Sequence, residues 1–244
     1  MSTSTDTHKF ALVTGGSRRI GKAIALHLAR LGYDVGVHFW TSADDAIRTK
    51  AEIESLGRKC YLYKADLSNP VEIENMFKEV TFSIPAIDVL VNSAAIMPKS
   101  DLLKISPQDW DRIIDINLRA PWLVSMRAGT IMKTGGAILN ISDAGAEMHW
   151  TGYGAYGISK CGLNELTRLL AKQLAPAVRV NAIAPGLLLR AEEMAEDDWN
   201  LLASRVPMQS AGDMNSLMAT IDLLISNGYI TGEIITLNGG ASLG

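Results

Sequence analysis

The segment Phe10-Ala-Leu-Val-Thr-Gly-Gly-Ser-Arg-Arg-Ile-Gly21 decides the fold. Its first five residues form an apolar run that ends at Thr14, glycines follow, and the apolar spacing of a helix begins at Ile20. Glycines between a buried strand and a helix let the backbone approach a phosphate group, and the helix N-terminus presents free N–H groups there. A turn of this kind can also use glycine only for its shape. The segment therefore predicts a strand–turn–helix unit and suggests an anion site.

The rest of the chain repeats this alternation of strand and helix. Because the predicted strands are continuous apolar runs, both faces of their sheet should be covered, and repeated βα units indicate parallel strands. We predict one α/β domain over residues 1–244, with a doubly wound parallel sheet and disordered residues 1–8. Further strands are predicted at 34–39, 60–65, 87–92, 137–142, 179–184 and 233–237, and helices at 20–31, 42–56, 71–82, 108–133, 153–174 and 215–226, with irregular helical structure at 191–204. A capping box at Ser42-Ala-Asp-Asp45 would start the second helix.

Composition limits the function classes. The 244 residues are 48% hydrophobic and 20% charged with a net charge of −3, which gives no reason to expect nucleic acid or an anionic membrane as partner. Cys60 and Cys161 lack metal-ligand spacing, so we expect no metal site and two buried small side chains. Residues 1–8 lack the apolar stretch of a signal peptide, and no apolar run is long enough to span a bilayer, so we expect a cytoplasmic protein.

The end of the second predicted strand bears on cofactor choice. NAD-binding proteins tend to carry Asp or Glu there for the ribose 2′-hydroxyl, but this strand ends His38-Phe-Trp-Thr-Ser42. Asp44 and Asp45 follow later and suit the first turn of a helix. Charge and hydroxyl donors for a 2′-phosphate are available from Arg18, His38, Thr41 and Ser42. The sequence favours NADPH.

Tyr156-Gly-Ile-Ser-Lys160 places two functional side chains one helical turn apart on one face. A neighbouring ammonium favours the phenolate, so we expect Lys160 to lower the pKa of Tyr156 and make it a proton donor and acceptor. The same spacing arises by chance in many helices. Its meaning depends on the rest of the chain.

Further motifs supply that context. They are Leu90-Val-Asn-Ser-Ala-Ala95, Ile116-Asn-Leu-Arg-Ala-Pro121, Asn181-Ala-Ile-Ala-Pro-Gly186, Tyr229-Ile-Thr-Gly232 and Asn238-Gly-Gly240. With the glycine turn and the Tyr156–Lys160 pair, they resemble the short-chain dehydrogenase/reductase family from Phe10 to Gly240. The resemblance implies a Rossmann-type sheet of about seven strands, a homotetramer built on the helices at 108–133 and 153–174, and a substrate lid at 187–212.

The resemblance also implies site residues. Asn117, Tyr156 and Lys160 would be catalytic, Lys160 would hold the nicotinamide ribose, and Asp66 would contact the adenine edge. The full cofactor set would be Gly15, Ser17, Arg18, Arg19, Ile20, His38, Thr41, Ser42, Asp66, Leu67, Asn92, Ser93, Ala94, Tyr156, Lys160, Pro185 and Gly186.

Three departures from the general family pattern resemble its pteridine reductase branch. Asp143 stands where the family has its catalytic serine, although the adjacent Ser142 could take that role. Arg19 replaces the middle glycine of the turn, and Tyr153 precedes Tyr156 by three residues. Met97 stands where the parasite enzymes of that branch have a phenylalanine that stacks on the pterin. The resemblance implies a fourth catalytic residue, Asp143, and a substrate set of Arg19, Met97, Asp143, Tyr153 and Tyr156.

The leading hypothesis is therefore NADPH-dependent reduction of a C=N bond in a dihydropterin or dihydrofolate, with the proton supplied by Tyr156 or Asp143. A carboxyl suits the ring nitrogens and amino group of a pterin, and Arg19 suits its oxygen. The alternative is a reductase of another imine or a ketone. A third possibility is a non-catalytic NADP-binding protein, against which the complete set of Asn117, Tyr156 and Lys160 argues.

Overall fold

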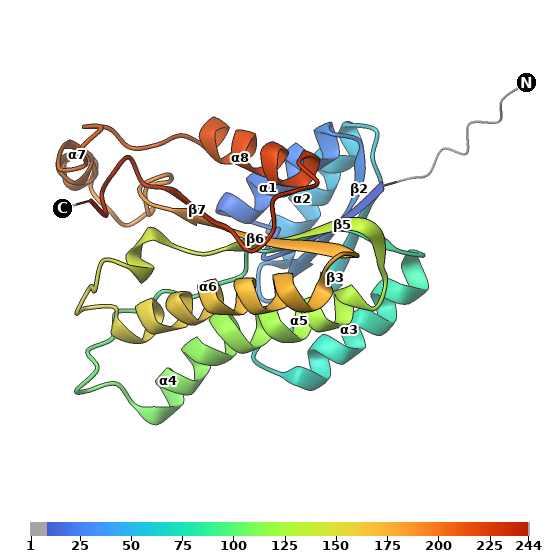
Figure 1. The fold of residues 1–244 in the computed structure, drawn as a ribbon, viewed down its shortest axis with the longest axis horizontal. Coiled ribbons are helices and arrows are strands. Elements are labelled where there is room, and N and C mark those ends of the chain that lie inside the picture. Colours follow the sequence, from blue (N-terminus) through green and yellow to red (C-terminus); the bar gives the residue numbers. More distant parts are fainter. Residues whose placement is uncertain (1–8, 244) are drawn as a thin grey trace, which may run out of the picture.

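The structure, a computed structural model, describes residues 9–243 and contains one seven-stranded sheet of parallel strands (Figure 1). The strand order is β3-β2-β1-β4-β5-β6-β7, so the chain starts in the middle and builds outward in two directions. The predicted single α/β domain with a Rossmann-type parallel sheet of seven strands is confirmed. The prediction that residues 1–8 are disordered lies outside the described residues.

The elements alternate as the apolar pattern predicts. The strands are β1 (Lys9–Thr14), β2 (Tyr33–Phe39), β3 (Cys60–Lys64), β4 (Ile87–Asn92), β5 (Met132–Ile141), β6 (Val178–Pro185) and β7 (Ile234–Leu237). The helices are α1 (Arg19–Arg30), α2 (Ala43–Ser55), α3 (Pro70–Ser83), α4 (Pro107–Ile114), α5 (Ala120–Gly129), α6 (Gly154–Leu174), α7 (Glu196–Ser204) and α8 (Met214–Ser226).

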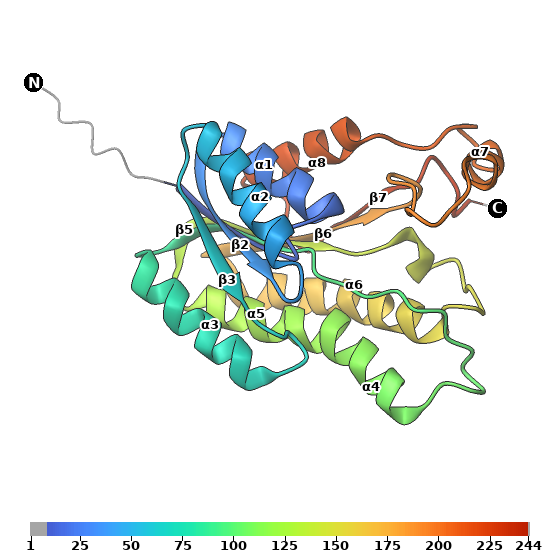
Figure 2. The ribbon, with the colours of Figure 1, turned by 180° about the vertical axis from the view of Figure 1, so that it is seen from behind.

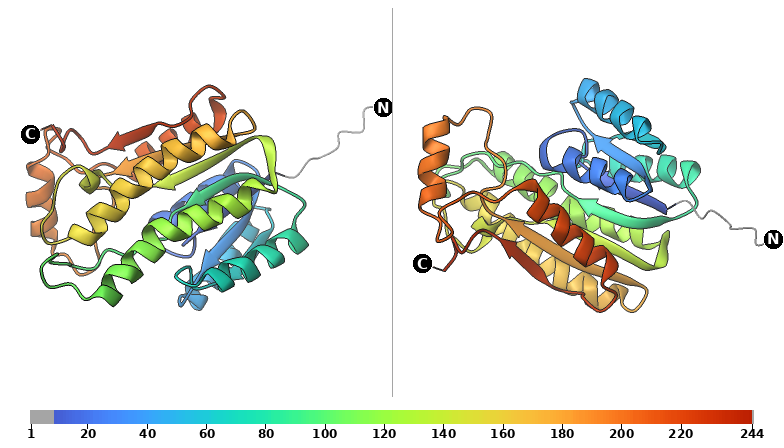
Figure 3. Two further views of the ribbon diagram at one scale, coloured as in Figure 1. Left: turned by 60° about the horizontal axis from the view of Figure 1, so that its bottom comes forward. Right: turned by 90° about the horizontal axis from the view of Figure 1, so that it is seen from above.

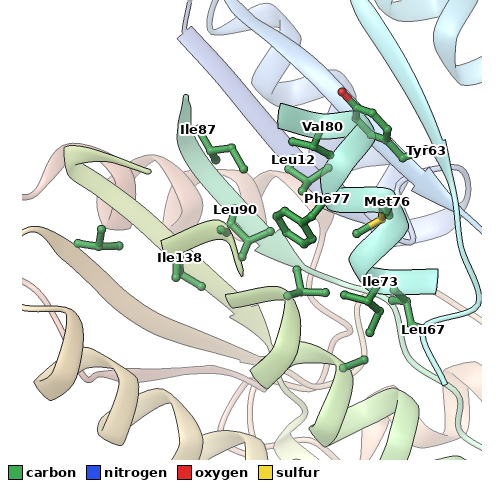
Figure 4. Close-up of a cluster of buried hydrophobic side chains, with 14 of the residues drawn as sticks. Leu12, Tyr63, Leu67, Ile73, Met76, Phe77, Val80, Ile87, Leu90 and Ile138 are labelled. Carbon is green, nitrogen blue, oxygen red and sulfur yellow. The ribbon is translucent and has the colours of Figure 1, made fainter. Parts of the chain in front are cut away.

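Helices cover both faces of the sheet. Helices α1, α2 and α8 lie on one face, and α3, α4, α5 and α6 lie on the other (Figures 1 and 2). Each face buries its own apolar cluster. The cluster under α3 and α5 includes Leu12, Phe77 and Leu90 (Figure 4), and the cluster under α1 and α8 includes Val13, Leu28 and Ile221. Burial on both faces explains why the strands are continuous apolar runs.

The sheet reverses its direction of growth between β1 and β4. Strand β1 pairs with β2 on one side and with β4 on the other, with Thr14 opposite Asn92. Open parallel sheets bind ligands outside the carboxyl ends of their strands at such a switch point. The views from below and above in Figure 3 show loops and α7 gathered at one end of the sheet. The topology therefore places a site next to Thr14 and Asn92.

The predicted helix at 108–133 is wrong in two respects. Helix α4 passes through one π-helical turn, Asp115–Arg119, before α5, and α5 ends at Gly129. The strand that follows starts at Met132, five residues earlier than predicted, because Met132 pairs with Ile87. A turn at Thr130 and Ile131 separates α5 from β5, and the apolar residues on both sides of it hide the boundary from helical periodicity.

Two smaller predictions are also wrong. Ser42 does precede α2, but its side chain does not cap the helix; its hydroxyl bonds to the Ser17 hydroxyl at 2.7 Å instead. Cys60 is buried as expected, and burial raises its thiol pKa to about 12, whereas Cys161 is exposed. Among residues 9–243, no helix is both long and apolar enough to span a membrane.

Candidate active site

The glycine turn packs directly against the end of β4. Gly15 has φ +63°, and a Cβ there would lie 2.9 Å from the Ala94 Cα. A Cβ on Gly21 would lie 2.2 Å from the Gly15 carbonyl oxygen. Neither position has room for a side chain, so these two glycines let α1 begin right beside the turn. Backbone N–H groups at the start of α1 therefore face the carboxyl end of the sheet.

Arg19 adopts a left-handed conformation with φ +50°, which favours glycine over other residues. The left-handed backbone at Arg19 explains why short-chain dehydrogenase/reductases, which the sequence resembles, usually have glycine at this position. The Arg19 guanidinium donates to the carbonyl oxygens of Leu189 and Arg190 at 3.3–3.4 Å. Arg19 thus spans the distance from the glycine turn to the segment predicted as the substrate lid.

A cavity of about 460 Å³ opens at the switch point. Many of the predicted cofactor residues line it, namely Gly15, Ser17, Arg18, Arg19, Ile20, His38, Thr41, Ser42, Asp66, Leu67, Ser93 and Ala94. The other predicted cofactor residues, Asn92, Tyr156, Lys160, Pro185 and Gly186, do not line it. The close-packed glycine turn, the helix N-terminus and this lining fit the adenosine and phosphate portion of a dinucleotide.

His38 holds the glycine turn in place. The Gly15 N–H donates to His38 Nδ1 at 3.1 Å, and Nε2 lies 3.0 Å from the Ala65 carbonyl oxygen. The ring is therefore a neutral tautomer with its proton on Nε2, and burial lowers its pKa to about 4. Both nitrogens are engaged and the ring carries no charge near neutrality. The expectation that His38 binds a 2′-phosphate does not agree with this geometry; the residue positions the turn.

The predicted 2′-phosphate residues do meet at the end of β2. Arg18, Thr41 and Ser42 line the same cavity. The Arg18 side chain is 63% exposed, and its Nε lies 3.8 Å from a carboxylate oxygen of Asp45. Asp45 also pairs with Arg48. The Asp45 carboxylate thus lies close to the place where a 2′-phosphate would bind. From the sequence, Asp45 was expected only to stabilise the first turn of α2.

Tyr156 and Asp143 form the central contact of the candidate active site. The Tyr156 hydroxyl donates to Asp143 Oδ2 at 2.7 Å, and the Gly145 N–H donates to Asp143 Oδ1 at 2.6 Å. Both oxygens of the carboxylate therefore act as acceptors. The neighbouring Ser142 is buried and its hydroxyl donates to Asn164. Asp143, and not Ser142, faces the tyrosine in this loop.

Lys160 is almost fully buried and donates to the Ile141 carbonyl oxygen at 2.8 Å. Burial lowers its pKa to about 8, and the Asp143 carboxylate partly opposes that shift. Its ammonium lies 5.7 Å from the centre of the Tyr156 ring. The pKa of Tyr156 is raised, first by burial and then by the Asp143 carboxylate and its hydrogen bond. The expected lowering of the Tyr156 pKa by Lys160 is wrong, because burial of the phenol and the contact with Asp143 both raise it.

Asn117 lies in the π-helical turn and is buried. Its amide oxygen accepts from the Ile96 N–H, and its amide nitrogen donates to the Ile96 carbonyl and to Ser159. The side chain thus ties the loop after β4 to α6. In this arrangement Asn117 positions the loop and the helix that carries Tyr156, and it does not touch the phenol.

The structure does not gather the predicted substrate residues into one cavity. Arg19 lines the cavity at the switch point, Met97 lines a neighbouring cavity beside α4, and Tyr153 lines a smaller one with Trp150. The Trp150 and Tyr153 rings pack edge to face with centroids 6.3 Å apart. Trp150, in the loop before α6, thus packs against a predicted substrate residue and lines a cavity with it.

The β4–α4 loop is nevertheless anchored beside Tyr156. Ser100 forms a bridge with Tyr153, its N–H donates to the Gly152 carbonyl, and the Gly154 N–H donates to the Ser100 carbonyl. This anchoring brings the segment that carries Met97 next to the start of α6. Met97 itself is 43% exposed, so it is free to contact a ligand.

Comparison with known proteins extends the likeness over nearly the whole chain. Residues 15–242 match the family model described as enoyl-(acyl carrier protein) reductase. The chain is 33% identical over 240 residues to the 3-oxoacyl-[acyl-carrier-protein] reductase FabG of Staphylococcus epidermidis, covering 96% of this chain and 98% of that protein.

Solved structures agree with this likeness. The FolM alternative dihydrofolate reductase 1 of Brucella canis, complexed with NADP, superposes with a TM-score of 0.91 at 32% identity, covering 97% of this chain and 94% of that one. A blue fluorescent protein from a metagenomic library, in complex with NADPH, has a TM-score of 0.89 at 29% identity, covering 96% and 97%. These neighbours support binding of a nicotinamide cofactor.

Proposed function

This chain belongs to the short-chain dehydrogenase/reductase family of oxidoreductases, and we propose that it uses NADPH to reduce the C=N bond of a dihydropterin or dihydrofolate. The hydrogen bond from Tyr156 to Asp143 is the observation that carries the proposal. A carboxylate accepts hydrogen bonds from the N–H and amino groups of a pterin ring, which a serine hydroxyl at this place would do less well. The likeness to the Brucella protein titled an alternative dihydrofolate reductase supports the same substrate class.

Held by the residues that line the cavity at the switch point, a nicotinamide cofactor would supply the hydride for the carbon of the C=N bond. Tyr156 supplies the proton to the nitrogen, because its hydroxyl is the proton-bearing partner in the pair with Asp143. Asp143 orients that hydroxyl and accepts a hydrogen bond from the substrate. Lys160, one turn along α6, would hold the ribose of the cofactor. The segment 187–212, which Arg19 contacts, would form the lid over the substrate.

Reduction of a ketone is the second candidate. The observation that favours it is the 33% identity to FabG, whose printed name is that of a 3-oxoacyl reductase. Against it stands Asp143, which replaces the serine expected in a general carbonyl reductase of this family. The two candidates use the same cofactor and the same Tyr156, so the substrate alone distinguishes them.

The substrate panel tests the proposal directly. We expect NADPH oxidation with dihydrobiopterin, dihydromonapterin or dihydrofolate, and much slower oxidation with 3-oxoacyl thioesters and simple cyclic imines. The measurement is the initial rate of absorbance loss of NADPH, with a no-substrate reaction as the control. Turnover of the ketones without turnover of any of these pteridines would establish the second candidate and overturn the first.

Arg18→Ala is expected to lower kcat/KM for NADPH by about tenfold while changing that for NADH less than twofold. The substitution removes a cation that lines the cofactor cavity and leaves Asp45 without that partner, so a 2′-phosphate meets a less favourable potential. The measurement is kcat/KM with each cofactor at a fixed, saturating substrate. Arg30→Ala, in the last turn of α1, is the matched control. An equal loss with both cofactors would contradict the assignment of Arg18.

We also propose that the protein acts in the cytoplasm as a homotetramer whose contacts involve α4, α5 and α6. Large apolar side chains are exposed on the latter two helices, namely Trp122, Met126, Ile158 and Leu169. Apolar exposure of this kind marks interaction surfaces in soluble proteins.

A further inference from the structure

Trp40 lies at the rim of the cofactor cavity and forms an exposed cation–π pair with Lys64. Trp40 directly follows β2, lines the cavity, and is 39% exposed. Lys64 ends β3, where its register partner is Phe39, the residue before Trp40. The Lys64 ammonium lies 5.5 Å from the centre of the Trp40 ring. Two neighbouring strand ends thus place one indole and one cation beside Thr41 and Ser42.

The charges around this rim indicate that Arg18 is not sufficient for a 2′-phosphate. Arg18 faces the Asp45 carboxylate at 3.8 Å, Asp45 also binds Arg48, and Asp44 lies in the same turn of α2. At the start of α2, the two carboxylates therefore offset the charges of Arg18 and Arg48. The cavity lining also contains Arg19, Arg112 and Asp66. A doubly charged phosphate ester needs a net positive surface to bind selectively.

Lys64 supplies a positive charge that is not cancelled. Within residues 9–243 it makes no ion pair with a carboxylate, and its contact is with the face of the Trp40 ring. That contact leaves the three N–H donors of the ammonium available for an incoming anion. It also restrains a long, flexible side chain against Trp40, which lines the cavity. The arrangement presents a cation that is held in place and still free to bind.

We propose that Lys64, held by Trp40, is a second cation for the 2′-phosphate of NADPH and that this pair determines the preference for NADPH over NADH. The inference rests on the proposed use of NADPH and goes beyond it by naming Trp40 in the β2–α2 turn and Lys64 at the end of β3 as residues that select the phosphate. Trp40 forms the wall of the subsite, and Lys64 reaches over it to the anion.

Binding of two nucleotide fragments by calorimetry tests the inference without catalysis. The probes are 2′,5′-ADP, which carries the 2′-phosphate, and 5′-AMP, which lacks it. We expect Lys64→Met to weaken binding of 2′,5′-ADP by about five- to tenfold at low salt and to leave 5′-AMP unchanged, with the difference shrinking as salt is raised. Lys64→Arg should retain most of the affinity, and Trp40→Leu should lose part of it.

Lys172→Met is the matched control, because Lys172 is an exposed lysine in the last turn of α6, and it should bind both probes like the parent protein. Equal weakening of both probes by Lys64→Met, or no weakening of either, would overturn the inference. If the parent protein itself does not distinguish 2′,5′-ADP from 5′-AMP, the proposed NADPH preference fails instead. If the parent protein binds 2′,5′-ADP more tightly than 5′-AMP and the Lys64→Met variant shows the same difference, only the proposed role of Lys64 fails.

Discussion

Tyr156→Phe is expected to reduce kcat by about 10²–10⁴-fold with little change in cofactor binding. The substitution deletes one hydroxyl and keeps the ring, which is buried at the start of α6. That hydroxyl is the donor to Asp143 and the proton source in the proposed reaction. Single-turnover rates measured with NADPH and an accepted substrate, together with the dissociation constant for NADPH, separate the loss of proton transfer from a loss of binding.

Tyr153→Phe is the matched control for this prediction. It deletes the same group three residues earlier, where the ring packs on Trp150 and lines a cavity with it. We expect Tyr153→Phe to change substrate KM more than kcat. A Tyr156→Phe protein that keeps its parent's single-turnover rate would show that the proton reaches the nitrogen by another route, and Asp143 would then be its first candidate source.

The order and type of the main elements could be predicted because the physical pattern is strong. Continuous apolar runs such as Phe10–Val13 and Val89–Val91 are buried on both faces, as a covered parallel sheet requires. The two glycines at 15 and 21 are needed wherever a helix starts this close to a neighbouring strand end. The apolar runs and the two glycines depend on local sequence and on the topology of the sheet, so the sequence alone predicts them.

Other features depend on contacts between residues far apart in the chain. His38 looked like a phosphate ligand, but the Gly15 N–H and the Ala65 carbonyl use both ring nitrogens. Ser42 has the sequence of a helix cap, yet its hydroxyl bonds to Ser17. The π-helical turn at 115–119 has no simple periodic signal. In each case a tertiary hydrogen bond or packing contact outweighs the local preference.

In the candidate active site, too, some features follow from local sequence and others depend on contacts between distant residues. Tyr156 and Lys160 are one turn apart because of their spacing, and the contact of Tyr156 with Asp143 agrees with the resemblance. The predicted direction of the Tyr156 pKa shift is wrong, because burial and the Asp143 carboxylate both raise the pKa of the phenol. Desolvation depends on the surrounding volume, which residue spacing does not encode. The catalytic residues could be predicted from their types and spacing, whereas the direction of the Tyr156 pKa shift depends on the fold.

Asp143→Ser is expected to lower kcat/KM for a dihydropterin by about 10- to 100-fold while leaving reduction of a ketone substrate, where one is accepted, unchanged or faster. The serine restores the residue that the wider family uses and removes the carboxylate that would pair with the substrate nitrogens. Removing that charge and its hydrogen bond also lowers the pKa of Tyr156 toward its ordinary value, because Asp143 contributes to the upward shift. We therefore expect the alkaline limb of the pH–rate profile to move to lower pH. The measurement is kcat/KM against pH for both substrate types.

Asp143→Asn separates the chemical role of this residue from its structural one. Asp143 Oδ1 accepts the Gly145 N–H and starts the short turn Ala144–Ala146. An asparagine keeps an oxygen acceptor for that N–H and removes the charge, so the turn should persist while dihydropterin reduction falls as in the serine variant. If the asparagine variant reduced dihydropterins as fast as the parent protein while the serine variant did not, Asp143 would serve only to shape the loop. Equal losses on dihydropterins and ketones in both variants would likewise refute a role in substrate choice.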